Sequence, residues 1–95
     1  MSEAALKKRV LAWLREQGAY AVKTAPPMDA GTPDVLVCWP PSGRLVAIEL
    51  KVGRNKPTAL QRRRLEEVEQ AGGHALVAYS LEEVIASLAS VSPAE

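Results

Sequence analysis

The chain has 95 residues, of which 47% are hydrophobic and 24% charged, and its formal net charge is +1. This composition excludes a disordered chain and predicts one domain over residues 1–90 with a short tail at 91–95. No stretch approaches the ~20 apolar residues of a membrane span. The single cysteine, Cys38, excludes an internal disulfide. We therefore expect a cytoplasmic protein with Cys38 in its core.

The charges are unevenly distributed along the chain. Residues 44–64 contain seven Lys or Arg and one acid, Glu49, whereas residues 66–95 contain six acids and no Lys or Arg. This asymmetry favours an anionic partner on one face, although two helix faces solvated by opposite charges would give the same pattern.

The first half of the chain predicts one helix followed by three strands. Ser2 is a good N-cap for a helix with apolar residues at helical spacing, and Gly18 supplies its end. Alternating residues predict a short strand at 19–24, and apolar runs predict two more at 35–39 and 44–51. The Pro-Pro-Ser-Gly link between the last two strands is short enough to make them an antiparallel hairpin.

The second half predicts a helix, a strand and a final helix. Thr58 and Gln61 match a capping box at the start of a helix that ends at a Gly-Gly pair. An apolar strand follows at 74–79, and its connection through a whole helix suits a parallel, right-handed crossover. Ser80 caps the last helix. We therefore expect an α/β fold of order α-β-β-β-α-β-α, with a small mixed sheet of about four strands flanked by helices.

Two carboxylates and a lysine stand at the ends of the two hairpin strands. Asp34 precedes the first strand and Glu49 lies near the end of the second, so the hairpin brings them together. Lys51 follows Glu49 by two residues and points to the same face. Because Mg²⁺ prefers hard oxygen ligands such as carboxylates, the cluster predicts a metal site beside a basic rim. Glu49 and Lys51 on their own could form just an ion pair.

These residues resemble a known nuclease motif. Pro33-Asp34, fourteen intervening residues and Glu49-Leu50-Lys51 are similar to the PD-(D/E)XK motif. Gly31 before the motif, Glu3 in the first helix and Gln61 in the helix after it resemble the VRR-NUC branch, the virus-type replication-repair nucleases. The resemblance extends from the first helix to the last strand and implies a restriction-endonuclease-like fold.

The resemblance implies which groups bind the metal. It makes Asp34 and Glu49 ligands together with the backbone carbonyl of Leu50, and it makes Glu3 a ligand directly or through water. For Glu3 the alternative is a favourable interaction with the positive end of the helix dipole. The implied ion is Mg²⁺, with Mn²⁺ as a possible substitute and no organic cofactor.

The resemblance also implies roles beside the metal. Lys51 would orient or help deprotonate the attacking water and stabilise transition-state charge, and Gln61 would hold Lys51 or the water in place. Gln61 has the alternative role of fourth residue in the Thr58 capping box. His74 has no partner ligands in the sequence, so we do not expect it to act as a general base.

Basic residues that flank the motif are candidates for phosphate contacts. On a loop and at a helix start lie Arg54, Lys56, Arg62 and Arg63. The alternative for each of these residues is a solvated surface charge that binds nothing. Trp39 at the hairpin tip is expected in the core or in a dimer surface, with stacking on a base as a further possibility.

The predicted function is a metal-dependent endonuclease that hydrolyses phosphodiester bonds in branched DNA, such as Holliday junctions or flaps. The resemblance further implies a homodimer and a phage or prophage product in a bacterial host. The alternative, of another class, is a nucleic-acid-binding module on the same fold with no catalysis. Two close carboxylates argue against it, because like charges held together are unfavourable unless a function needs them.

Overall fold

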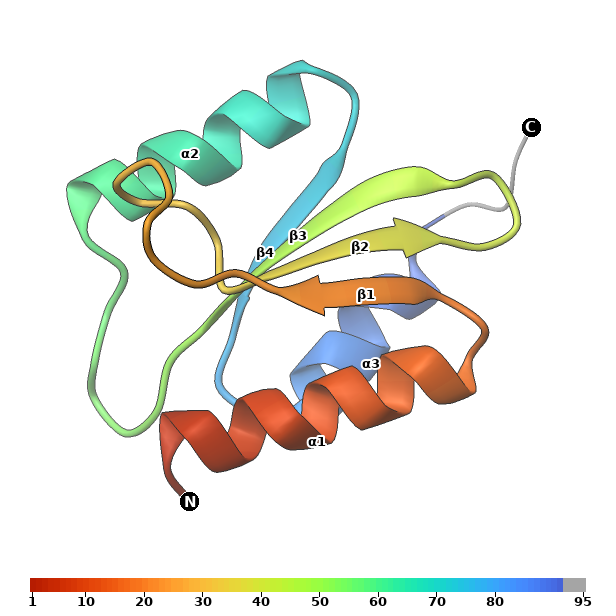
Figure 1. Ribbon diagram of the computed structural model, residues 1–95, viewed down its shortest axis with the longest axis horizontal. Helices are drawn as coiled ribbons and strands as arrows, with labels where there is room; N and C mark the ends of the chain where they lie inside the picture. The colour runs from red at the N-terminus through yellow and green to blue at the C-terminus, as the bar shows by residue number, and fades with distance from the viewer. Residues whose placement is uncertain (92–95) are drawn as a thin grey trace.

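Three helices and four strands make up residues 1–91, the part of the chain that the computed structural model describes (Figure 1). They are α1 (Glu3–Glu16), β1 (Tyr20–Lys23), β2 (Val35–Trp39), β3 (Arg44–Leu50), α2 (Ala59–Gln70), β4 (His74–Ala78) and α3 (Leu81–Ala89). The predicted order is confirmed. Of the expected tail at 91–95, only Val91 lies within the described residues, and it is buried against the core. None of the described helices is long and apolar enough to cross a membrane.

The four strands form one mixed sheet in the order β1-β2-β3-β4. β2 pairs antiparallel with β1 and with β3, whereas β3 and β4 are parallel, as the short hairpin and the helical crossover predict. Helices contact both faces of β3, and its last five residues are all buried. A strand covered on both faces reads as a continuous apolar run, which makes the single carboxylate within it, Glu49, conspicuous.

The helices lie on opposite faces of the sheet. α1 and α3 pack together against one face, where Leu6, Val10 and Leu14 of α1 meet Val35 and Ile48 of the hairpin in the core (Figure 1). α2 packs on the other face, on β3 and β4. Among the described residues no helix covers this second face of β1 and β2.

A row of exposed side chains marks the uncovered face. Tyr20 pairs in register with Cys38, and Cys38 with Leu45, so the three lie side by side across β1, β2 and β3. Tyr20 is 73% and Leu45 45% exposed, and Cys38 is exposed as well. The expectation of a core Cys38 is therefore wrong, because its side of β2 lies opposite α1 and α3 and α2 covers only β3 and β4 of that face.

The hairpin tip is packed more tightly than the sequence suggests. Trp39 stacks on Trp13 of α1, with 6.1 Å between ring centroids and 22° between ring planes. Both rings are half-buried and pack against the core. Trp39 thus closes the hairpin end of the core, and the exposed apolar surface lies on the row Tyr20–Cys38–Leu45 instead.

Candidate active site

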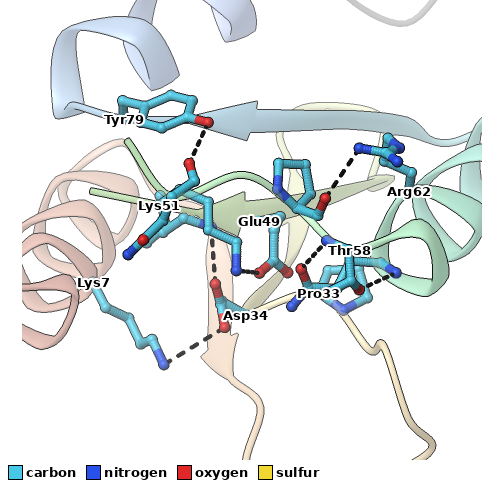
Figure 2. Close-up of polar contacts among 12 residues, drawn as sticks. Lys7, Pro33, Asp34, Glu49, Lys51, Thr58, Arg62 and Tyr79 are labelled. Atoms are coloured by element: carbon cyan, nitrogen blue, oxygen red, sulfur yellow. Dashed lines mark hydrogen bonds and ion pairs between the residues drawn. The ribbon is translucent and has the colours of Figure 1, made fainter. Parts of the chain in front are cut away.

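The β2–β3 pairing places the two carboxylates opposite each other. Val35 pairs with Ile48, and continuing this register by one residue sets Asp34 opposite Glu49. Residues directly opposite in an antiparallel pair have Cβ atoms about 4.5–5.5 Å apart and share a face of the sheet. The carboxylates thus meet on the face that α2 covers further along β3, as the hairpin predicts (Figure 2).

The chain leading to Asp34 is fixed by contacts with β1 and α2. Thr24 at the end of β1 donates from its backbone N–H to the Asp34 carbonyl (2.9 Å) and from its hydroxyl to the Pro33 carbonyl (2.8 Å). Gly31 has a φ of 81°, and a Cβ there would come within 2.8 Å of the Leu60 side chain. Only glycine therefore lets this loop approach α2 so closely in that conformation.

Glu49 is the one charged residue that the described part of the chain buries, with 1% of its surface exposed. Its Oε2 lies 3.5 Å from the Lys51 Nζ, and its Oε1 is buried and has no hydrogen-bond partner among residues 1–91. Buried carboxylate oxygens are normally hydrogen-bonded, so an unpartnered one indicates a strained functional group or a site for an ion.

The surroundings of Glu49 disfavour its charged form. Burial first, and the neighbouring Asp34 carboxylate second, raise the pKa of Glu49 from its ordinary 4.5 to about 7, against the opposing effect of Lys51. Strongly raised pKa values of this kind cluster at functional sites. A divalent cation held by Asp34 and Glu49 would counter this effect by favouring the ionised carboxylates.

Two lysines flank the pair, one for each carboxylate. Lys51 approaches Glu49 at 3.5 Å and its side chain is only 13% exposed. Lys7 extends from α1 and places its Nζ 3.9 Å from Asp34 Oδ1 (Figure 2). From the sequence, Lys7 is only a weak candidate for a phosphate contact, as are Lys8 and Lys23, and its contact with Asp34 is not predicted. Its position one helical turn after Glu3 was the available signal, because residues four apart share a helix face.

The Leu50 peptide carries a further oxygen toward the site. Its N–H donates to Asp34 Oδ2 at 2.8 Å, so Leu50 directs its polar groups to the β2 side. The N–H and C=O of one residue in a strand point to the same side, and the register sets Pro33 opposite. Proline has no N–H to pair with the Leu50 carbonyl. The Pro33-Asp34 sequence therefore leaves that carbonyl available beside the carboxylates.

The oxygens at this point fit a hard divalent cation. Two carboxylates and a backbone carbonyl are ligands that Mg²⁺ accepts when water and a substrate phosphate complete its octahedron. Among residues 1–91, no three His, Cys, Asp or Glu side chains form a cluster that could hold a metal. Glu3, half-buried at the start of α1, thus does not form a carboxylate triad with Asp34 and Glu49.

Gln61 lies in the capping box that the sequence predicted. Its Oε1 accepts from the Thr58 N–H (2.8 Å), and its own N–H donates to the Thr58 hydroxyl (3.1 Å). The side-chain carbonyl is thereby engaged in starting α2, and the amide NH₂ is the group left to contact water or substrate. A catalytic role for Gln61 stays a prediction that rests on this NH₂.

The loop between β3 and α2 carries Arg54 and Lys56, both exposed. The Tyr79 hydroxyl donates to the Asn55 carbonyl at 2.7 Å and fastens this loop to the end of β4 (Figure 2). The two cations are thus held on a defined loop that begins at Lys51.

The two arginines at the start of α2 are partly engaged within the protein. Arg62 donates to the Pro57 carbonyl at 3.0 Å (Figure 2), and Arg63 lies 3.7 Å from Glu67 in an exposed i,i+4 pair. Exposed pairs of this kind stabilise a helix only slightly and leave most guanidinium donors free. Phosphate contacts by either arginine stay a prediction.

Two solved structures share this fold. The first, described as a VRR_NUC domain, superposes with a TM-score of 0.79 over 95% of this chain and 97% of its own, at 24% sequence identity. The second, described as a VRR_NUC domain protein, gives a TM-score of 0.76 over 94% and 86%, at 22% identity. No family model and no curated protein matches the sequence. The similarity confirms the VRR-NUC-like fold, while function must be argued from the site.

Proposed function

We propose that this chain is a VRR-NUC-type nuclease that hydrolyses DNA phosphodiester bonds with a divalent metal. The observation that carries the proposal is the opposed pair of Asp34 and Glu49. One buried oxygen of Glu49 has no hydrogen-bond partner among the described residues, and the pKa of Glu49 is raised to about 7. Its support is the shared fold with structures described as VRR_NUC domains. Structural ion pairs alone do not explain an unpartnered buried oxygen.

Each residue of the site then has a distinct task. Asp34, Glu49 and the Leu50 carbonyl would hold the ion, Mg²⁺ by preference with Mn²⁺ as substitute. The bound cation supplies electrostatic stabilisation of the reacting phosphate and a more acidic water. Lys51, mostly buried and 3.5 Å from Glu49 Oε2, would orient the attacking water and balance transition-state charge. Lys7 would position the Asp34 carboxylate from α1.

A cleavage panel tests the proposal. Labelled duplex, single strand, flap, fork and four-way junction are incubated with the protein in Mg²⁺ or Mn²⁺, and products are resolved on denaturing gels. We expect cleavage of at least one substrate in either metal and complete loss in excess chelator, because the carboxylates need the ion to act. Tight binding without product in Mn²⁺ on every substrate would favour a binding module instead.

The preferred substrate that we propose is branched DNA, cut by a homodimer. A symmetric dimer presents two equivalent sites, which suits a substrate whose strands are related by symmetry. The row Tyr20–Cys38–Leu45 supplies an exposed, largely apolar surface on the face of β1 and β2 that the described helices leave open. We therefore propose that a second copy of the chain binds this face.

Leu45→Arg is expected to convert the dimer into a monomer. Leu45 ends the exposed row, and a guanidinium there would be buried against its own copy in a symmetric contact. Sedimentation equilibrium at micromolar concentration measures the mass, and the matched control is Ile85→Arg on α3, where Ile85 is 37% exposed against 45% for Leu45. A wild-type chain that sediments only at 10.2 kDa would remove the dimer from the proposal.

A further inference from the structure

A basic groove runs between α1 and the edge strand β1. It has a volume of about 620 Å³, and its walls carry Lys7, Lys8 and Arg15 from α1 and Lys23 from β1. Within residues 1–91, no acidic side chain lines it. Leu11 is buried and forms part of the lining, while short alanine side chains on the exposed face of the helix leave the groove open.

The groove shares Lys7 with a second hollow that Asp34 lines. This second hollow, of about 350 Å³, lies along the loop between β1 and β2. Lys7 thus lines both hollows, and its Nζ lies 3.9 Å from Asp34 Oδ1 (Figure 2). A chain of negative charges lying in the groove would reach the site at Lys7.

The cations of the groove are well placed for contacts with phosphate. Lys8 and Lys23 are exposed and make no ion pair among the described residues. Arg15 donates one bond to the Ala21 carbonyl at 3.0 Å, which orients the guanidinium and leaves its other N–H groups free. From Lys8 to Arg15 the helix rises about 10 Å, the axial length of about three nucleotides of one B-DNA strand.

We propose that this groove binds the phosphodiester backbone of the DNA strand that enters the active site. The proposal rests on the proposed nuclease function and adds a second strand path, on the α1 side, to the one expected at Arg54 and Lys56. Lysine and arginine contacts with phosphates position a strand without reading its sequence. The groove would therefore set where the strand lies relative to Asp34, and not which bases it carries.

Lys8→Ala and Lys23→Ala, singly and together, test the groove by DNA binding in chelator, where no cleavage can occur. Fluorescence anisotropy with a labelled duplex between about 50 and 200 mM salt gives the affinity and its salt slope. Each lost phosphate contact is expected to reduce the slope by about 0.9 and the affinity near 0.1 M salt roughly five- to eightfold. The double variant is expected to lose roughly 25- to 60-fold.

Arg9→Ala is the matched control. Arg9 is exposed and neighbours Lys8 on α1, yet it does not line the groove, so its removal takes away the same charge and is expected to leave the slope unchanged. If all three single variants change DNA binding equally, or if none changes it, the groove does not bind DNA. Lys23 would then serve only to protect the edge strand β1 from pairing with another chain. A wild-type chain that binds through Lys8 and Lys23 but never cleaves would instead refute the nuclease.

Discussion

Lys51→Met is expected to bind DNA as the wild-type chain does and to cleave it roughly 10²- to 10³-fold more slowly. The lysine stem is largely buried, with only 13% of the side chain exposed, and methionine fills similar space without the charge. What is lost is the ammonium 3.5 Å from Glu49 Oε2, which we propose orients the water and balances transition-state charge. Single-turnover cleavage at saturating Mn²⁺ isolates this step from binding.

The control for Lys51→Met is Arg9→Met, which removes an exposed cation of α1 away from the carboxylates. Its cleavage rate is expected to equal that of the wild-type chain. Because Lys51 also lowers the pKa of Glu49, both variants are compared near pH 8, where Glu49 is expected to be ionised. Unchanged single-turnover cleavage by Lys51→Met protein would remove Lys51 from the mechanism.

Glu49→Gln is expected to lose cleavage and, without metal, to be more stable than the wild-type chain above pH 7. The pKa of Glu49 is raised from 4.5 to about 7 in the folded protein. Between those values the folded state binds more protons than the unfolded state, so wild-type stability falls as pH rises through this window. A pKa shift of this size corresponds to about 3 kcal/mol in the free energy of unfolding. The variant recovers less than this, because Lys51 loses its charged partner. We expect Glu49→Gln to gain about 1–3 kcal/mol of stability.

Urea denaturation in chelator from about pH 5 to 8 measures this gain. The difference between Glu49→Gln and wild-type proteins is expected to be small near pH 5 and to grow toward pH 8. Glu66→Gln is the control, because Glu66 is exposed on α2 and pairs with no cation among the described residues. If the stability difference between Glu49→Gln and wild-type proteins does not change with pH, the folded protein does not disfavour the ionised form of Glu49.

The sequence predicts that Asp34 and Glu49 come together because the geometry that joins them is local. A four-residue hairpin link determines the register of β2 on β3, and the register determines that Asp34 faces Glu49. The capping box at Thr58 and Gln61 is equally local and forms as predicted. Chain order and helix caps likewise specify the α/β arrangement, since each depends on neighbours within a few residues.

The contacts that the sequence did not predict join elements far apart in the chain. Lys7 reaches Asp34 from α1, and although it shares a helix face with Glu3, that spacing alone does not show that this face lies beside Asp34. Cys38 is exposed because α2 covers β3 and β4 and stops short of β2. Trp39 is half-buried because Trp13 arrives from α1 to stack on it. Each outcome depends on helix placement over the sheet, which alternation alone does not specify.

The most direct test of the metal-dependent carboxylate pair is Mn²⁺-dependent cleavage of the panel substrates by wild-type and Asp34→Asn proteins. Asparagine keeps an oxygen that can accept from the Leu50 N–H, now at 2.8 Å from Asp34 Oδ2, so the fold is expected to persist. We expect product from the wild-type chain in Mn²⁺, none in chelator, and none from Asp34→Asn. Equal product from both proteins, or none from the wild-type chain on any substrate, would contradict it.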